Sequence, residues 1–346
     1  MIVLGLEASC DETAAAVVNM SAPPGKRILS NVVHSQIDLH RQFGGVVPEI
    51  AARAHLDWMD LVIPRALTEA QIEPPALDLV AATSGPGLIG GLVVSALAGR
   101  AMAQALGCAY QDTNHLAGHA LTARLTDDTP FPYLLLLVSG GHSQLLIVEG
   151  PWRFTPLGST IDDAVGEAFD KVAKLLDLGF PGGPAVEACA QTGDPKRFDL
   201  PIPLHNKPNF DFSFSGLKTA VRRALELLEH PKAQDKADLA ASFQAAAATS
   251  LTIKTRRALQ HCKDRYGSGL PLAVAGGVAA NRTLGRQLAA LAAEFGTTVS
   301  AAPLSLCGDN AAMIAYAGGA QWQEKPELRW DRAPQPRWPL SDLSAQ

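Results

Sequence analysis

Apolar and polar positions along the first 130 residues follow a pattern that predicts short strands interspersed with longer helices. Short apolar runs favour strands, and apolar residues recurring every three or four positions over longer windows favour helices. The expected strands lie near 2–7, 13–19, 28–34 and 77–84. The expected helices lie near 48–70, 90–106 and 114–125. Strands that alternate with helices of this length are typical of an α/β sheet.

The second half of the chain repeats this arrangement. Strands are expected near 133–139, 144–149, 152–157, 272–275 and 297–301. Helices are expected near 162–177, 184–192, 214–229, 236–262, 280–294 and 308–322. In each half an early strand meets a polar turn, and a later strand ends in glycines before a helix, so we predict two related lobes. The first lobe is expected to comprise residues 1–130 with residues 310–346 packed back on it, and the second lobe residues 131–309.

Length and composition agree with two globular domains. The chain has 346 residues, of which 47% are apolar, and this length exceeds what one hydrophobic core usually serves. The five cysteines form no CxxC pair, which argues against a zinc ribbon or a disulfide framework and favours reduced thiols in a cytoplasm. The first seven residues lack a basic flank, so a strand is expected there and not a signal peptide. No uncharged apolar run of about 18 residues occurs, which argues against a membrane span.

The formal net charge of −5 bears on any nucleic-acid partner. A protein that binds RNA alone usually carries a basic excess. An RNA-binding role would therefore need a partner protein or local basic patches. Candidates for such patches are Lys218, Arg222, Arg223, Lys254, Arg256 and Arg257, although exposed helix charge explains them equally well.

Four glycine or hydroxyl turns follow expected strands and are candidates for phosphate binding. They cover residues 7–13, 84–87, 138–143 and 275–278. Glycine lets backbone N–H groups approach a phosphate closely, and a following helix adds its positive end. Tight turns also need glycine for their own geometry, so the repetition of the turns carries this hypothesis. The chain has no GxxxxGK[ST] motif, which argues against an ordinary P-loop enzyme.

Two histidines one helical turn apart are candidate metal ligands. His115 and His119 share one face of the expected helix, so both imidazoles can bind one ion. Asp309, which precedes the last expected helix, is the candidate third ligand. Two histidines and one carboxylate with open positions suit ferrous iron, with zinc as the second choice. A metalloprotease needs a glutamate directly after the first histidine, and Leu116 stands there.

Asp11 and Glu12 in the first turn are candidates for a general base or for binding a metal-bound water. The alternative is that they only cap a helix or form the turn. Residues 181–184 form a glycine-proline turn that opens a helix, where a ligand hydroxyl can meet backbone amides or Glu187.

Taken together, these motifs resemble the tRNA N6-adenosine threonylcarbamoyltransferase family. The similar segments run through nearly the whole chain: 5–13, 44–49, 85–88, 115–119, 137–142, 161–176, 181–184, 211–218, 275–282, 309–310 and 336–340. The resemblance implies the two-lobed actin-like/Hsp70 ATPase (ASKHA) architecture, with a ribonuclease-H-like sheet flanked by helices in each lobe. It also implies transfer of the threonylcarbamoyl group from threonylcarbamoyl-AMP to N6 of the adenosine directly 3′ of the anticodon, in tRNAs that read codons beginning with A.

The resemblance further implies roles for individual residues and partners. His115, His119 and Asp309 would hold one iron ion per subunit. The adenylate would contact Val138, Ser139, Gly140, Gly141, His142, Asp170, Gly183, Asn281 and also Glu187. Bacterial members of the family act with a TsaB-like paralogue and a small TsaE-like ATPase.

Three other functions compete with this interpretation. An actin-fold ATPase or small-molecule kinase would turn over ATP with an acceptor that is not RNA, and it needs no iron site. A glycoprotein endopeptidase, the older name for this family, is disfavoured by Leu116. A purely structural scaffold in a tRNA-modifying complex has no need to keep the histidine pair.

Overall fold

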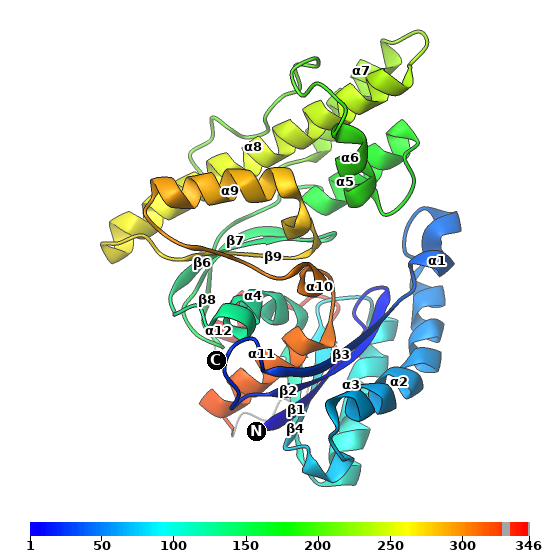
Figure 1. Ribbon diagram of the computed structural model, residues 1–346, viewed down its shortest axis with the longest axis vertical. Helices are drawn as coiled ribbons and strands as arrows, with labels where there is room; N and C mark the ends of the chain where they lie inside the picture. Colours follow the sequence, from blue (N-terminus) through cyan, green and yellow to red (C-terminus); the bar gives the residue numbers. More distant parts are fainter. Residues whose placement is uncertain (327–332, 345–346) are drawn as a thin grey trace. The chain divides into compact units, whose positions relative to one another are not determined.

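A computed structural model describes residues 1–326 and 333–344 of the chain (Figure 1). The chain divides into two compact units, which we call the first and second units. The first unit comprises Met1–Pro130, Glu149–Phe154 and Gly308–Gln346. The second unit comprises Phe131–Val148 and Thr155–Cys307. The sequence pattern gave no sign that Glu149–Phe154 belongs with the first unit.

The sheet of the first unit has five strands in the order β3-β2-β1-β4-β5. These strands are β1 (Ile2–Glu7), β2 (Glu12–Asn19), β3 (Ile28–Ser35), β4 (Leu79–Gly85) and β5 (Ala109–Asn114). The first three pair antiparallel, whereas β4 and β5 run parallel to β1. The parallel arrangement brings the carboxyl ends of β1, β4 and β5 to one edge of the sheet, where the candidate metal ligands begin.

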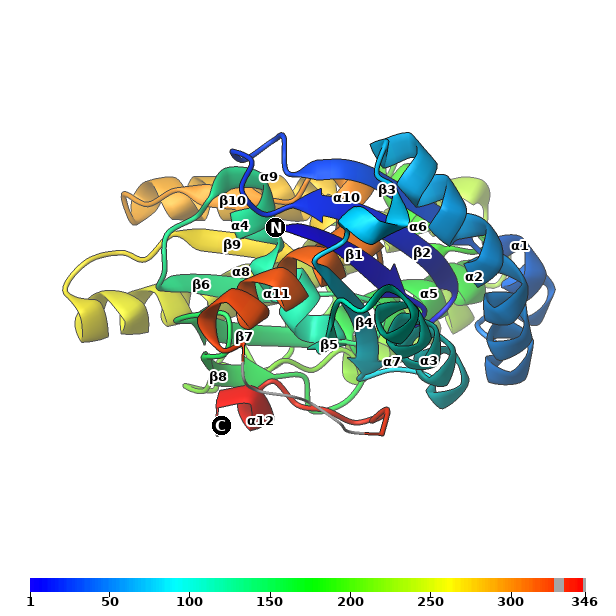
Figure 2. The ribbon, with the colours of Figure 1, turned by 90° about the horizontal axis from the view of Figure 1, so that it is seen from below.

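Helices cover both faces of this sheet (Figure 2). The long helices are α2 (Pro48–Ala70), α3 (Ile89–Leu106), α4 (His115–Asp127) and α11 (Ala311–Glu324), and α1 (Ile37–His40) and α12 (Ser341–Ser344) are short. Leu4 and Leu6 of β1 point into a core shared with α2 and α3. Gly5 points to the opposite face, where an added Cβ would lie 2.2 Å from the carbonyl oxygen of Ala311. Glycine at this position therefore lets α11 lie directly on the strand.

Helix α3 is the one described helix that is long and apolar enough to cross a membrane by length and composition alone. In the structure it packs on the sheet instead. An added Cβ at Gly91 would lie 1.8 Å from the carbonyl oxygen of Ala8, and one at Gly99 would lie 2.9 Å from Cβ of Ala82. Ser95 Oγ donates a hydrogen bond to the carbonyl of Thr83. These close contacts are those of a core helix.

Strand β5 was missed by the sequence analysis, which expected no strand between residues 106 and 114. Its inner residues are polar but buried, including Gln111 and Asp112. The Asp112 carboxylate accepts hydrogen bonds from Ser84 Oγ (2.5 Å) and Tyr110 Oη (2.7 Å) and pairs with Arg100 (2.9 Å). Polar groups can be buried in this way because each has a hydrogen-bond or ion-pair partner. A search for apolar periodicity does not detect such a strand, since its buried positions are polar.

The sheet of the second unit repeats the pairing scheme of the first, with the strand order β10-β9-β6-β7-β8. Its strands are β6 (Tyr133–Val138), β7 (Ser143–Val148), β8 (Phe154–Ser159), β9 (Leu272–Ala275) and β10 (Val299–Ala301). Its helices are α5 (Val165–Leu176), α6 (Gly182–Ala190), α7 (Ser215–Glu226), α8 (Ala233–Tyr266), α9 (Arg282–Glu294) and the short α10 (Leu304–Cys307). Strand β6 pairs antiparallel with β7 and parallel with β9, as β1 does with β2 and β4. The predicted α/β class with two related sheets is confirmed.

Candidate functional site

Helix α4 begins at the first candidate metal ligand. Asn114 caps it: its side-chain oxygen accepts hydrogen bonds from Leu116 N (2.9 Å) and Ala117 N (3.2 Å). This capping places His115 at the first helical position and His119 one turn later on the same face. The two imidazole rings stand edge to face, with centroids 4.8 Å apart.

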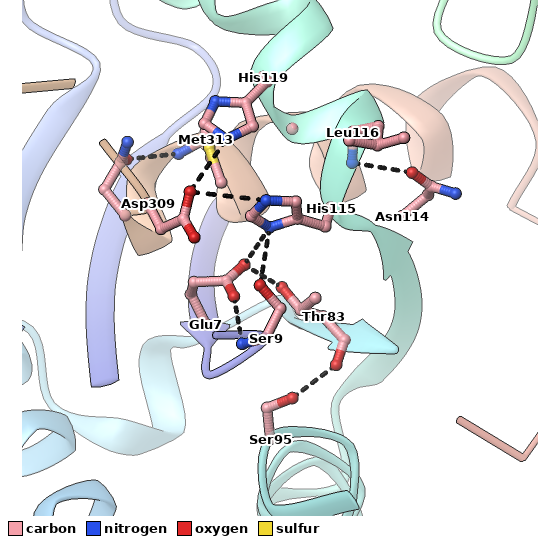
Figure 3. Close-up of polar contacts among 12 residues, drawn as sticks. Glu7, Ser9, Thr83, Ser95, Asn114, His115, Leu116, His119, Asp309 and Met313 are labelled. Carbon is pink, nitrogen blue, oxygen red and sulfur yellow. Dashed lines mark hydrogen bonds and ion pairs between the residues drawn. The ribbon is translucent and has the colours of Figure 1, made fainter. Parts of the chain in front are cut away.

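Asp309 reaches this histidine pair from the start of α11 (Figure 3). Its Oδ1 lies 3.1 Å from Nε2 of His119 and 3.5 Å from Nε2 of His115. The three ligand atoms all lie within 4.8 Å of one another, which is a spacing that can hold one metal ion. The sequence analysis expected a strand directly before Asp309, whereas the structure has the short helix α10 there.

The donor set and the surrounding charge fit a divalent cation. Two imidazole nitrogens and one carboxylate oxygen are ligands that iron and zinc both accept. Burial lowers the pKa of His115, but the carboxylates of Asp309 and Glu7 outweigh burial and raise this pKa to about 9. Burial raises the pKa of Glu12 well above its usual range, and the neighbouring carboxylate of Asp309 adds to the shift. A cation here would relieve this concentration of negative charge.

The first turn, residues 7–13, holds carboxylates and no glycine. Asp11 lies in the turn itself, and Glu12 begins β2. The backbone carbonyl of Asp11 accepts a hydrogen bond from Gln36 N (2.9 Å), which fixes the turn. Burial raises the pKa of the intervening Cys10 thiol, and Asp11 adds to the shift, so Cys10 is a poor nucleophile.

Glu7 is a site residue that the sequence analysis missed. It is fully buried, and its Oε2 lies 3.1 Å from Nδ1 of His115 (Figure 3). Burial opposes ionisation of Glu7, but the neighbouring His115 holds its pKa below the usual range. The sequence shows only that a carboxylate ends an apolar strand directly before a polar turn, and this pattern does not indicate a histidine partner.

The second unit contains a cavity of about 300 Å³. Five of the residues assigned to the adenylate line it, namely Gly140, Asp170, Gly183, Glu187 and Asn281. These residues come from the turn after β6, from α5, from α6 and from the start of α9. The structure therefore gathers residues that are 141 positions apart in the chain (281 − 140) around one hollow.

The other four residues assigned to the adenylate lie at the end of β6 or in the turn after it and are not part of the cavity lining. Val138 is buried in the sheet. The backbone N–H of Ser139 donates to the carbonyl of His142 (2.8 Å), and the N–H of His142 donates to Ser139 Oγ (3.1 Å). These two bonds close the tight turn that carries Gly140 and Gly141.

Three polar side chains at the cavity already hold neighbouring backbone. Asp170 Oδ1 accepts from Gly182 N (2.7 Å), and Glu187 Oε1 accepts from Arg282 N (2.9 Å). Asn281 caps α9 by accepting from Leu284 N (3.0 Å). They consequently shape the pocket walls.

The turn at residues 84–87 is filled by the chain itself. An added Cβ at Gly85 would lie 2.1 Å from the carbonyl oxygen of Gln335, and one at Gly87 would lie 2.6 Å from that of Ser9. The N–H of Gln335 donates to the carbonyl of Ser84 (2.7 Å). The glycines of this turn therefore serve the packing of the C-terminal segment, and we do not assign a phosphate to them.

The candidate basic patch on α8 is also used internally. Lys254 Nζ is buried and donates to the carbonyls of Lys207 (3.1 Å) and Asn209 (2.8 Å). Arg257 donates to the carbonyls of Lys207 and His205, and Arg256 pairs with Glu294. These cations hold the 205–209 loop and helix α9.

A model of the family described as tRNA N6-adenosine threonylcarbamoyltransferase matches residues 27–316 of the chain. A protein of that name from Paramagnetospirillum magneticum is 56% identical over 341 residues, covering 98% of this chain and 97% of its own length. A protein of the same name from Brucella anthropi is 54% identical over 347 residues, covering 100% of this chain and 97% of its own length. Another from Ruegeria pomeroyi is 53% identical over 348 residues, covering 99% of this chain and 95% of its own length. The chain belongs to the tRNA N6-adenosine threonylcarbamoyltransferase family. The predicted family and its transferase activity on tRNA are confirmed.

Solved structures with low sequence identity show the fold. The chain superposes on HypF from T. kodakarensis with a TM-score of 0.61 at 15% identity, covering 93% of this chain and 48% of that one. It superposes on the activator of 2-hydroxyisocaproyl-CoA dehydratase from Clostridium difficile with a TM-score of 0.52 at 13% identity, covering 96% and 100%. These structural similarities confirm the predicted actin-like (ASKHA) fold. They give no information about the substrate.

Proposed function

We propose that this chain transfers the threonylcarbamoyl group of threonylcarbamoyl-AMP to N6 of the adenosine directly 3′ of the anticodon, with ferrous iron held by His115, His119 and Asp309. The observation that carries the proposal is the convergence of those three side chains, whose ligand atoms lie within 4.8 Å of one another. Zinc is the second choice of metal, since the same donors suit it.

The exocyclic amine of adenine is a weak nucleophile, so the carbonyl that it attacks must be activated. The mixed carbamoyl-phosphate anhydride provides this activation because AMP is a good leaving group. The N6–carbon bond forms, the carbon–oxygen bond to phosphate breaks, and AMP leaves with that electron pair. The metal, when bound, supplies positive charge that offsets negative charge on the phosphate oxygens.

The chain's own residues bind the adenylate and accept the proton. In the second unit, the open backbone at Gly140 and Gly141 suits an anionic oxygen, and Asp170, Glu187 and Asn281 suit hydroxyl and amine groups of a nucleoside. In the first unit, Asp11 is the candidate base for the amine proton. In its neighbour Glu12, the other candidate, burial raises the pKa and so favours the protonated form.

Partners complete the proposal. Helices α2 and α3 expose the apolar side chains of Leu56, Leu61, Ile89 and Leu97, a surface that suits a TsaB-like paralogue. A TsaE-like ATPase is proposed from the family resemblance alone. The net charge of −5 and the internal use of Lys254 and Arg257 support tRNA binding that is shared with partners. We further propose a cytoplasmic protein without a membrane anchor, in keeping with its five free cysteines.

One reconstitution tests the function. The purified chain, its two partner proteins, synthetic threonylcarbamoyl-AMP and unmodified tRNA are mixed under anaerobic conditions with Fe²⁺, Zn²⁺ or chelator. Mass spectrometry of the digested tRNA should show threonylcarbamoyl-adenosine, with more product for Fe²⁺ than for Zn²⁺ and none with chelator. Hydrolysis of ATP with a small-molecule acceptor, together with no modified nucleoside, would favour the kinase alternative.

A further inference from the structure

Glu7 makes contacts that go beyond holding the sheet together. It is the last residue of β1 and is fully buried. Its Oε1 accepts a hydrogen bond from Ser9 N (2.6 Å), and its Oε2 accepts one from Thr83 Oγ1 (2.5 Å). The third group on this carboxylate is Nδ1 of His115, 3.1 Å from Oε2. Three donors thus converge on one buried carboxylate, and such an arrangement stabilises its ionised form.

An ionised carboxylate can only accept hydrogen bonds, and this decides the state of His115 when a metal is bound. The proton of the neutral imidazole must lie on Nδ1, facing Glu7, which leaves the Nε2 lone pair free. Nε2 lies 3.5 Å from Asp309 Oδ1. Two acceptors that face each other need a cation between them, and a metal ion supplies it.

His119 offers a comparison within the same site. Its Nε2 faces Asp309 at 3.1 Å, but its buried Nδ1 has no hydrogen-bond partner among the described residues. No described protein group therefore selects the tautomer of His119 or holds its ring from behind. His115 has two such groups at Nδ1, the Glu7 carboxylate and the Ser9 hydroxyl, each 3.1 Å away. A hydroxyl can donate or accept and so does not select a tautomer, which leaves Glu7 as the group that does.

We propose that Glu7 is a positioning residue that fixes the Nδ1–H tautomer and the ring orientation of His115, so that its Nε2 is ready to bind the metal. The proposal rests on the metal site of the proposed function. Thr83 and the backbone of Ser9 extend this support, because they hold the two oxygens of Glu7 in place. Carboxylates behind metal-bound histidines typically raise metal affinity by about 10- to 100-fold.

The test measures metal affinity of the full chain, independently of transfer. Co²⁺ is titrated into metal-free protein and followed by its visible absorption, in wild type and Glu7→Gln. The glutamine keeps the volume and one acceptor oxygen but loses the charge. We expect the dissociation constant to rise about 10- to 100-fold. A rise in the Co²⁺ dissociation constant of less than twofold would overturn the proposal. A wild-type chain that binds no Co²⁺ would instead contradict the proposed function.

A matched control separates positioning from general stability. Asp112 is another buried carboxylate of the same sheet, held by Ser84, Tyr110 and Arg100. Within the described part of the chain, no hydrogen bond or ion pair joins it to either histidine. Asp112→Asn should lower the melting temperature at least as much as Glu7→Gln yet leave Co²⁺ affinity within about twofold. Equal losses of affinity in both variants would show that Glu7 acts only through the fold.

Two further readouts keep the proposal testable if Glu7→Gln folds poorly. Thr83→Val keeps the shape of the side chain but removes one donor to Glu7, and should weaken Co²⁺ binding by about 2- to 5-fold. In the Co²⁺-loaded wild type, the exchangeable Nδ1–H resonance of His115, assigned by its through-space contact with the side chain of residue 83, should exchange slowly with solvent. Faster exchange in Thr83→Val is expected, and unchanged exchange with unchanged affinity would overturn the proposal.

Discussion

Two sets of glycines, one in each unit, serve different purposes although the two sheets share one pairing scheme. In the first unit, a Cβ added to Gly85, Gly87 or Gly91 would lie within 2.6 Å of a backbone oxygen. In the second unit, a Cβ added to Gly140 or Gly183 would meet nothing within 4 Å. The first set permits close packing, whereas the second leaves room beside the backbone for a ligand.

The charged side chains of the two candidate sites also differ. The candidate metal centre of the first unit is built from charged groups, of which Glu7 and His115 are buried and Asp309 is partly exposed. The cavity of the second unit is lined by glycines, by apolar side chains such as Phe169 and Val278, and by polar side chains that hold neighbouring backbone. Under the proposed function, a duplicated fold would thus separate two tasks: holding a cation in the first unit and accommodating a nucleotide in the second.

The largest expected effect comes from removing the histidine pair. His115→Ala with His119→Ala leaves one ligand of the three, so bound metal should fall below about a tenth of an equivalent and transfer by about 10³-fold or more. Metal content by mass spectrometry and single-turnover transfer are measured on the same samples. AMP binding should stay unchanged, because the cavity lies within the second unit. Normal transfer by the metal-free variant would refute the role of the metal.

The affinity of the first unit for metal should depend steeply on pH. The pKa of His115 is raised to about 9 in the metal-free chain, so metal must displace a proton at neutral pH. Affinity for Zn²⁺, measured by competition with a chelator of known pH dependence, should therefore rise about tenfold per pH unit up to pH 9. AMP affinity serves as the control over the same range. A flat profile for Zn²⁺ would mean that His115 is already neutral at pH 7.

Filling the cavity with a larger side chain should weaken AMP binding by the second unit. Gly183→Leu places a side chain in the cavity, so the dissociation constant of AMP should rise about tenfold or more. Gly216→Leu is the matched control, because Gly216 is also the second residue of a helix with open space around its Cβ position but does not line the cavity. Isothermal titration with AMP distinguishes them. Equal AMP affinities in the two variants would contradict a nucleotide site at this cavity.

The packed glycines should instead control stability. Gly85→Ala puts a methyl group against the carbonyl oxygen of Gln335 at a backbone φ of +147°, so unfolding free energy should fall by about 3 kcal/mol. Chemical denaturation measures this loss. Gly140→Ala, whose methyl group meets open space, should change it by less than about 1 kcal/mol. Similar losses in both variants would remove the distinction between the two sets of glycines.

The smallest effect is expected at the cap of the metal-bearing helix. Asn114→Ala removes the acceptor for Leu116 N and Ala117 N and the donor to the carbonyl of Trp338, and should cost about 1–2 kcal/mol of unfolding free energy. Asn114→Asp keeps the cap but loses the donor, so denaturation curves should show partial recovery. No recovery would show that the contact with Trp338 outweighs the cap.

The sequence predicted most of the fold and the histidine pair of the candidate metal site, because both leave local patterns. The spacing of His115 and His119 shows a shared helix face without any tertiary information. Asp309 is 190 residues beyond His119 (309 − 119), and only the family resemblance indicated that the two would meet. Strand β5 escaped detection because its buried residues are polar and are balanced by partners distant in sequence.

The roles of the glycine turns could not be predicted from sequence. Gly85 and Gly140 both follow strands and look alike as motifs, yet Gln335 fills the space beside one and nothing fills the space beside the other. Glu7 was missed for a similar reason. Its partners Thr83 and His115 lie 76 and 108 positions away, so no local spacing marks it as support for a metal ligand.

The most direct test of the central claim, that the ion at His115, His119 and Asp309 is required for transfer, is a titration of activity against metal. Fe²⁺ is added anaerobically to metal-free chain with its partners present, and single-turnover transfer to tRNA is recorded at each ratio. We predict that transfer rises in proportion to added Fe²⁺ and reaches its plateau at one ion per chain. Full transfer before any metal is added would contradict the account.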